Sequence, residues 1–200
     1  MDPFENSKIA TLKNLESGFD KSRKGSVDEP IKNLLDAINK LDNYYTTSSC
    51  SGRIMITSSS IKGKKHENKW YFVSHEVISN EKIDELWKLI NEIDDELWLR
   101  MDAAILHVAC KTLKDAHLLL ILAKKVGFKR GGIISVKRKV VELISTEHVE
   151  MPLKVDEKIL TDFDGFKLII EKCNEKLNRT HEKIQKFEEE VKKLKSSKQQ

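Results

Sequence analysis

The stretch of sequence that decides the fold is residues 97–127, LWLRMDAAILHVACKTLKDAHLLLILAKKVG. Its first part, residues 97–110, is largely apolar and reads as one long β-strand. Thr112 can cap a following helix whose apolar side chains recur every three or four residues, and Gly127 suits the left-handed position that ends a helix. We therefore expect a long strand followed directly by an amphipathic helix.

Further elements on both sides of this stretch define the fold class. Residues 53–57 and 70–75 are rich in β-branched and aromatic residues, and the polar stretch between them predicts a hairpin with a long loop. Ser79 can cap a helix that runs to Ile93, and residues 131–146 predict further strand in one or two segments. This order favours an α+β fold with a mixed or antiparallel sheet over a doubly wound parallel fold.

Two helices are expected at the N-terminal end. Residues 4–17 predict a short helix, and a basic loop at 21–25 follows it. Ser26 begins an S-x-x-E capping box, and apolar residues from Ile31 to Leu41 then follow at helical spacing. The sequence therefore predicts an amphipathic second helix that starts at Ser26.

The composition shifts toward charge and helix formers beyond Pro152. Apolar and small residues then follow one another at alternating steps of three and four: Ile170, Cys173, Leu177, Thr180, Ile184, Phe187, Val191 and Leu194. This pattern fits a helix packed back on the core, and it equally fits a coiled coil that self-associates or binds a partner helix. We place a boundary here, with a core at 1–153 and a charged helical extension at 154–200.

Composition excludes several classes of protein. Hydrophobic residues make up 39% of the 200 residues and charged residues 34%, which is far from both disordered and membrane-embedded chains. No apolar run approaches the roughly 18 residues of a membrane span, and the first residues lack a secretory signal, so we expect a cytoplasmic protein. Cys50, Cys110 and Cys173 are too few and too widely spaced for a disulfide framework or a zinc site, so no metal is expected.

Positive charge is concentrated in one segment. Residues 124–139 hold seven basic residues and no acidic one: Lys124, Lys125, Lys129, Arg130, Lys137, Arg138 and Lys139. Such a run can be a solvated face, and it can also bind the phosphates of a nucleic acid. We favour phosphate contacts because no acid in the segment balances the charge.

The most unusual segment is residues 44–53, YYTTSSCSGR, which links a helix to a strand. Hydroxyls, a thiol and an arginine in a tight connection can surround a polar ligand with donors. An ordinary Ser/Thr-rich turn has the same composition, so the residues alone leave both interpretations open. Cys50 could likewise be a nucleophile or a small buried side chain.

Four blocks of sequence resemble the tRNA wybutosine-synthesizing protein 3 family. They are TTSSCSGRI at 46–54, WYFVSH at 70–75, AILHVACKTLKDAHLLLILAKKVGFKRGGI at 104–133 and VELISTEHVEMPL at 141–153. The resemblance covers about 4–153 and implies an S-adenosylmethionine-dependent methyltransferase. The implied substrate is tRNA(Phe), methylated at the N4 nitrogen of a demethylwyosine-type tricyclic base on the 3′ side of the anticodon.

The resemblance also implies site residues. His75 and His107 are the implied catalytic residues, and Tyr45, Trp70 or Phe128 could stack on the base. The implied cofactor- or substrate-binding residues are Ser48, Ser49, Cys50, Ser51, Gly52, Arg53, Gly127, Phe128, Gly131 and Gly132.

The residues themselves leave some of these roles open. On a regular pleat His107 shares a face with Leu99 and Met101, which fits a core histidine as well as a strand end that opens into the active site. His75 ends a strand and is expected to be a base or a ligand contact. Arg53 is expected to bind an anion, because its guanidinium stays protonated.

The chain departs from the family pattern at two places. Gly131 stands where a serine is common, and residues 101–104, MDAA, replace a stretch that carries Glu-Pro. No G-x-G-x-x-G follows a strand into a helix, so a Rossmann-type cofactor site is not expected. Two other functions remain in view: a non-catalytic RNA-binding module, which would not bind S-adenosylmethionine, and an assembly protein that acts through its C-terminal helix.

Overall fold

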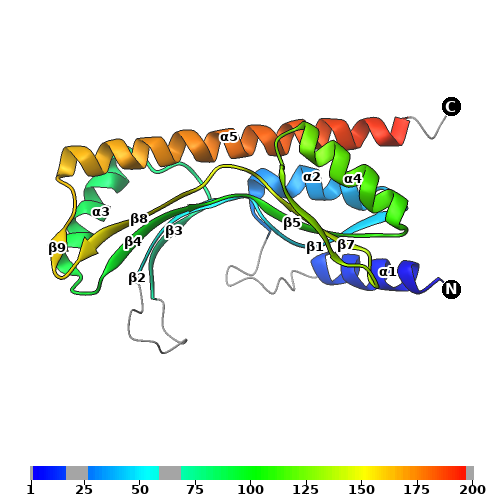
Figure 1. Cartoon of the computed structure of the whole chain (residues 1–200), viewed down its shortest axis with the longest axis horizontal. Helices are drawn as coiled ribbons and strands as arrows, with labels where there is room; N and C mark the ends of the chain where they lie inside the picture. The colour runs from blue at the N-terminus through cyan, green and yellow to red at the C-terminus, as the bar shows by residue number, and fades with distance from the viewer. Residues whose placement is uncertain (1, 17–26, 59–68, 197–200) are drawn as a thin grey trace. The chain divides into compact units, whose positions relative to one another are not determined.

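The computed structural model describes residues 2–16, 27–58 and 69–196 (Figure 1). The expected basic loop at 21–25, Ser26 and most of the expected hairpin loop lie outside these residues. The elements are α1 (Pro3–Glu16), α2 (Glu29–Asn39), β1 (Tyr44–Cys50), β2 (Arg53–Ser58), β3 (Trp70–Ser74), α3 (Asn80–Glu92), β4 (Leu97–Asp102), β5 (Ile105–Cys110), α4 (Leu113–Lys125), β6 (Arg130–Ser135), β7 (Val140–Ile144), β8 (Val149–Val155), β9 (Lys158–Ile159) and α5 (Phe163–Ser196).

The chain divides into two compact units, and each contains segments distant in sequence. The first unit comprises residues 1–51, 104–146 and 180–200, and the second comprises 52–103 and 147–179. Both sheets are antiparallel, which confirms the predicted α+β class.

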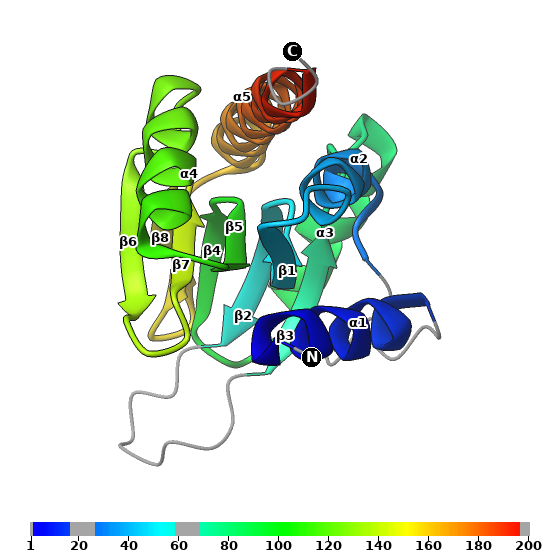
Figure 2. The ribbon, with the colours of Figure 1, turned by 90° about the vertical axis from the view of Figure 1, so that its right-hand side faces the viewer.

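The first unit is built on a four-stranded sheet of order β1-β5-β7-β6. Its core is formed by the buried side chains of α2, α4, the strands and residues 180–196 of α5. Figure 2 shows α2 and α4 on one side of this sheet and α1 on the other side of β1. One face of the sheet is therefore buried under helices, and the opposite face carries α1 at its β1 edge.

The second unit is built on a five-stranded sheet of order β3-β2-β4-β8-β9. Helix α3 and residues 163–179 of α5 pack on it, and their apolar side chains form a second core. In this core the Trp87 ring lies 5.7 Å from that of Phe163 and 5.5 Å from that of Phe166.

Helix ends are fixed by local side chains. Thr112 and Asp115 form a reciprocal capping box at the start of α4, and Gly127 has φ +105° just beyond its end, as expected. Ser79 caps α3 as predicted. The prediction for α2 is wrong in one respect: its N-cap is Asp28, whose side chain accepts hydrogen bonds from Ser51 and makes no cap bond.

The predicted long strand at 97–110 is in fact two strands that belong to different sheets. The break falls at Ala103 and Ala104, where Ala104 exchanges backbone and side-chain hydrogen bonds with Ser145. Because of this break, His107 does not continue the pleat of Leu99 and Met101. Those two side chains are fully buried in the second unit, whereas the His107 side chain is 24% exposed in the first.

Three strands are not predicted by the sequence: β1, β8 and the two-residue β9. Residues 44–50 form β1, although the Ser/Thr-rich composition favoured a connection. Residues 149–155 form β8, although the composition beyond Pro152 predicts helix. Both β1 and β8 are paired along most of their length, so cross-strand pairing holds the Ser48–Cys50 end of β1 and Pro152 of β8 in strands despite their low β-propensity.

The C-terminal helix packs on the core, as one of the two alternatives predicted. Seven of its eight seam residues are at most 1% exposed, with Ile170, Cys173 and Leu177 in the second core and Ile184, Phe187 and Val191 in the first. These side chains are therefore not available to a partner helix. Over the described ranges, we find no helix with a long enough apolar stretch to span a bilayer.

Candidate active site

Three polar side chains form a row across the first sheet on the face opposite its core. The strand register places Ser48 of β1 opposite His107 of β5, and His107 opposite Glu142 of β7. Ser48 Oγ lies 2.5 Å from His107 Nδ1, and His107 Nε2 lies 2.9 Å from Glu142 Oε2. Both nitrogens of the imidazole therefore have a hydrogen-bond partner.

A β-bulge brings Ser48 to this face. In a regular strand Thr46 and Ser48 would point to the same side, but the register of β1 shifts between them. Thr46 is 2% exposed on the core side, where its backbone N–H donates to Asn39. Ser48 is exposed on the other side, beside His107. The extra residue, Thr47, is thus what gives the imidazole a hydroxyl partner.

The hydrogen-bond partners of His107 favour one tautomer of the imidazole. An ionised carboxylate only accepts hydrogen bonds, so Glu142 is satisfied when His107 Nε2 carries the proton. The lone pair of Nδ1 is then directed at Ser48, whose hydroxyl can donate to it. The arrangement can accept a proton at Nδ1 while Glu142 stabilises the resulting positive charge.

The two predicted glycines of β6 differ in environment. Gly131 has φ +119°, and a Cβ there would lie 2.1 Å from the carbonyl oxygen of Glu142, so only glycine fits. Gly132 lies opposite Glu142, and no described atom is within 4 Å of where its Cβ would be. Gly132 therefore leaves open space at the end of the Ser48–His107–Glu142 row.

Other residues of the 48–51 block lie on both faces. Cys50 is half-buried and lies opposite Ile105, on the same face as His107. Ser49 lies opposite the buried Leu106, on the core side. Ser51 is fully buried, and its N–H and hydroxyl donate to Asp28 Oδ2 over 2.9 and 3.3 Å. Of this block, Ser48 and Cys50 are the residues on the face of the row.

The remaining predicted residues of the first and second blocks, from Gly52 onward, lie in the second unit. His75 directly follows β3, and its Nδ1 is 3.0 Å from the carbonyl oxygen of Gly52. Arg53 pairs with Asp102 over 3.1 Å, and its guanidinium carbon lies 4.8 Å from the centroid of the Trp70 ring. The positive charge of Arg53, expected to bind an anion, is thus balanced within the protein.

Two of the three aromatic residues expected to stack on a base are at least partly accessible. Trp70 is 38% exposed, and Tyr45 is half-buried with its ring 5.2 Å from that of Phe4. Phe128 is 1% exposed and packs against Phe187 at 5.4 Å, so its predicted place in the site is corrected to the core. Gly127 is likewise structural, because a Cβ there would meet the Lys183 side chain at 2.9 Å.

The basic segment is mostly exposed, and part of its positive charge is neutralised by other residues. Six of its seven basic residues are exposed, and Lys139 is half-buried. Lys125 pairs with Glu190 of α5 over 2.7 Å, and the Arg130 guanidinium donates to the carbonyl oxygen of Ser145. An acid distant in sequence therefore offsets part of the charge.

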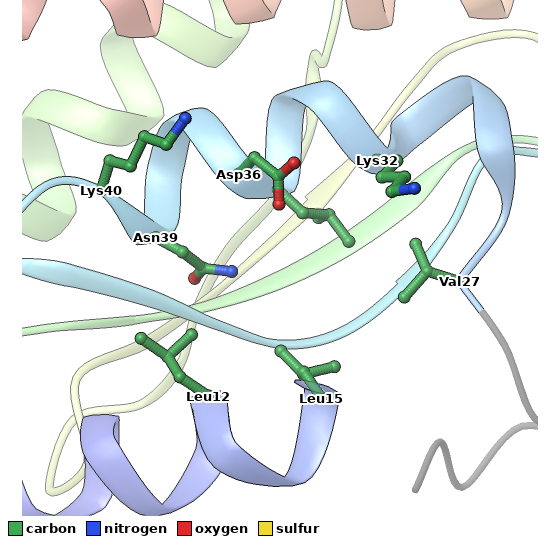
Figure 3. A pocket seen from close by; sticks show the side chains of 8 residues that line it. Leu12, Leu15, Val27, Lys32, Asp36, Asn39 and Lys40 are labelled. Carbon is green, nitrogen blue, oxygen red and sulfur yellow. The ribbon is translucent and has the colours of Figure 1, made fainter. Parts of the chain in front are cut away.

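A cavity of about 430 Å³ lies between α1 and α2 (Figure 3). It has aliphatic walls and a charged rim, and it is lined by Leu12, Leu15, Val27, Lys32, Leu35, Asp36, Asn39 and Lys40. Asn39 also bonds Thr46, so the cavity adjoins β1, the edge strand that carries Ser48.

Sequence reasoning missed Glu142. The residue stands between apolar neighbours in VVELI, a pattern that indicates a polar side chain on the outer face of a strand. Pairing β7 with β5 in the correct register was needed to place that side chain beside His107, and a single sequence does not supply the register.

Fold and site together define an α+β protein with a polar, non-Rossmann site on an antiparallel sheet. Residues 6–193 match the family model described as Methyltransferase TYW3, and the chain belongs to this family. The match continues past residue 153, where the resemblance was expected to end, so the family pattern includes most of α5.

Individual relatives agree with this assignment. A Thermococcus sibiricus protein named "tRNA(Phe) 7-((3-amino-3-carboxypropyl)-4-demethylwyosine(37)-N(4))-methyltransferase" is 42% identical, over 96% of this chain and 97% of its own. A Xenopus laevis protein named as a tRNA wybutosine-synthesizing protein 3 homolog is 32% identical, over 84% of this chain and 68% of its own. The solved structure of the PH1069 protein from Pyrococcus horikoshii superposes with a TM-score of 0.83 at 37% identity, covering 94% of this chain and 95% of that one.

Proposed function

We propose that this protein methylates the N4 nitrogen of a demethylwyosine-type base in tRNA(Phe), with S-adenosylmethionine as the methyl donor, in the formation of wyosine-type bases in the cytoplasm. The observation that carries the proposal is the 42% identity with the Thermococcus sibiricus enzyme of that name over nearly the whole of both chains. Similarity that covers both chains from end to end favours a shared reaction more strongly than a shared fold does.

The reaction needs positioning and one proton acceptor. The substrate nitrogen is the nucleophile, so no covalent intermediate on the protein is required. S-adenosylmethionine supplies the methyl group on a positively charged sulfur. The protein must hold the nitrogen in line with that group and accept the proton that the nitrogen loses. His107, with Nδ1 directed at Ser48, supports this role in the first unit, and His75 stays a predicted second catalytic residue.

The cavity between α1 and α2 fits the donor by its chemistry. Its aliphatic side chains, Leu12, Leu15 and Leu35, suit the adenine ring. Asp36 suits the ribose hydroxyls or the ammonium group, and the lysines at its rim, Lys32 and Lys40, suit the carboxylate. We therefore include these residues as those that hold the donor, in place of the Rossmann glycines that the chain lacks.

The tRNA would be bound through the basic segment. Lys137 and Arg138 lie exposed at the turn between β6 and β7, and β6 also carries Gly132. Phosphate contacts at this turn would hold the tRNA near the face with the His107 row, because the same hairpin carries Glu142.

The deciding experiment uses tRNA(Phe) isolated with a demethylwyosine-type base, labelled S-adenosylmethionine and the full chain. We expect one labelled methyl group per tRNA, located on N4 by nucleoside mass analysis. Substrates with and without the 3-amino-3-carboxypropyl group show which precursor is accepted. Binding of tRNA without methylation of either precursor would reject the proposal and favour a non-catalytic RNA-binding module.

A further inference from the structure

Glu142 is the residue whose position calls for an explanation. Its side chain is 28% exposed on an otherwise apolar strand, VVELI, and its Oε2 accepts from His107 Nε2 over 2.9 Å. The opposite nitrogen of the same ring faces Ser48 at 2.5 Å. A carboxylate, an imidazole and a hydroxyl joined in this order form a relay in which the carboxylate fixes the ring and its tautomer.

We propose that Glu142 is a positioning residue for methyl transfer, which holds His107 so that Nδ1 takes up, through Ser48, the proton lost by the substrate nitrogen. The inference rests on the proposed function. As the nitrogen–methyl bond forms and the carbon–sulfur bond breaks, the bonding pair stays on sulfur, which becomes a neutral thioether. The proton of the nitrogen passes to Ser48 Oγ, while the proton of that hydroxyl passes to His107 Nδ1.

The positive charge that the relay creates on His107 is balanced by the negative charge of Glu142. His107 becomes an imidazolium with protons on both nitrogens, and the negative charge of Glu142 lies 2.9 Å from one of them. At partial exposure this pair keeps a real interaction, because water does not fully screen charges in contact. Ser48 ends with one proton, as it began, so it carries the proton without changing its own state.

Gly132 supplies room for the base at the same site. It lies opposite Glu142 on the edge strand β6, and no described atom occupies the space above it within 4 Å of a Cβ. A flat tricyclic base needs such an open surface beside the relay. We therefore place the acceptor base across the row, with its N4 edge at Ser48 and the rest of the base directed toward Gly132, three strands away.

The first test is on the wild-type protein and requires no substitution. Nitrogen NMR of the histidine side chains should show His107 as the Nε2–H tautomer at neutral pH, assigned by comparison with His107→Gln. An Nδ1–H tautomer would overturn the relay, because the ring would then donate to Ser48.

The second test is the variant Glu142→Gln, with Glu142→Asp as the conservative rescue and Glu182→Gln as the matched control. Glu182 is an exposed residue of α5 in the same unit, and its substitution removes the same charge. We expect Glu142→Gln to lower single-turnover methyl transfer about 100-fold with tRNA and donor affinities unchanged, and Glu142→Asp to restore part of it.

The nitrogen spectrum of His107 separates positioning from a structural effect. A glutamine at position 142 can donate as well as accept, so Glu142→Gln should lose the single Nε2–H tautomer expected for the wild type. A lower rate with an unchanged tautomer would overturn the inference, and so would a wild-type rate.

The third test fills the open space. Gly132→Val should lower kcat/KM for tRNA at least about tenfold while donor binding and thermal stability stay near wild type, since no described atom beyond the chain neighbours lies within 4 Å of the added Cβ. Wild-type turnover of this variant would reject the placement of the base; if it does not fold, Gly132→Ala is tested in the same way. Absence of methyl transfer by the wild type would instead reject the proposed function itself.

Discussion

At the scale of single residues, Gly131 and Gly132 are neighbours with opposite requirements. Gly131 combines a left-handed φ with a Cβ position 2.1 Å from a backbone oxygen, whereas Gly132 faces open space. We expect Gly131→Ala to lower the free energy of unfolding by more than about 2 kcal/mol, because the strand must move away from β7. Gly132→Ala should change it by less than about 1 kcal/mol. Urea denaturation of the two variants measures the difference, and equal stabilities would contradict it.

Cys50 invites a covalent mechanism that methylation of nitrogen does not need. It lies on the face of the His107 row, opposite Ile105. A thiolate there would compete with the base for the methyl group, so we expect Cys50→Ser to retain transfer within about tenfold of wild type. His107→Ala should lose about 100-fold or more, and His75→Ala should also lose more than Cys50→Ser. Single-turnover assays decide this, and a methylated Cys50 on the reaction path would contradict it.

The three cysteines should differ in reactivity toward alkylating reagents. Burial raises the pKa of Cys110 to about 12 and that of Cys173 to about 11, so both remain thiols at pH 8. Their thiolate forms become abundant only as the pH approaches those values. Iodoacetamide at pH 8 should therefore modify Cys50 first in the folded protein, and Cys50→Ser should abolish the fast phase. Peptide mass analysis would contradict this if Cys110 or Cys173 reacted equally fast.

At the scale of elements, the turn between β6 and β7 is the part of the basic segment we expect to govern tRNA affinity. Lys137 and Arg138 are exposed there, whereas Lys125 is already paired with Glu190. Replacing both turn residues with alanine should weaken tRNA binding and lower the salt slope by about two units, one for each lost phosphate contact. Donor binding should not change.

A matched pair on α5 serves as the control for this prediction. Lys192 and Lys193 bond Glu188 and Glu190, so their charges are balanced within the helix. Replacing both with alanine should leave the salt slope near wild type. An equal loss for the two pairs would show that net charge, rather than the turn, sets the affinity.

The elements also show what the sequence could and could not predict. Helices α3 and α4 were predicted with their caps, because Ser79 and Thr112 act through local hydrogen bonds. The break of 97–110 into β4 and β5 was not, because it depends on Ala104 pairing with Ser145, which lies 41 residues away. Local chemistry is visible in a single sequence, whereas long-range pairing is not.

The candidate site was predicted in the same partial way. Ser48, His107 and Gly132 were proposed from family-like blocks, and they lie in one row of the first sheet. Phe128 was proposed from the same blocks but is buried, since a motif does not state which way a side chain points. Glu142 was missed because only strand register connects it to His107.

At the scale of the whole molecule, α5 determines whether a chain truncated before it can fold and methylate tRNA. The division predicted from the sequence implies that residues 1–153 hold the complete methyltransferase. The structure leads us to expect that a chain ended at Lys154 does not fold, because it lacks α5. The buried side chains that it loses are Phe166, Ile170, Cys173, Leu177, Thr180, Ile184, Phe187 and Val191.

The expected loss follows from the size of these side chains. Burying one large apolar side chain contributes about 1.5–3 kcal/mol, and a folded protein is stable by only about 5–15 kcal/mol. The truncated chain should therefore lack a cooperative thermal transition by circular dichroism, whereas a chain ended at Ser196 should unfold like the full one. A folded, active chain of 154 residues would instead support the division at 153.

The path of the chain through its two units also constrains how the protein is made. The chain passes from one unit to the other after residues 51, 103, 146 and 179, and the first core is completed only by Ile184, Phe187 and Val191. Many proteins finish an N-terminal domain while the rest is still being synthesised. Here almost the whole chain must leave the ribosome before either core is complete, because both cores include side chains of α5. Until α5 has been synthesised, the apolar faces of both sheets are only partly covered.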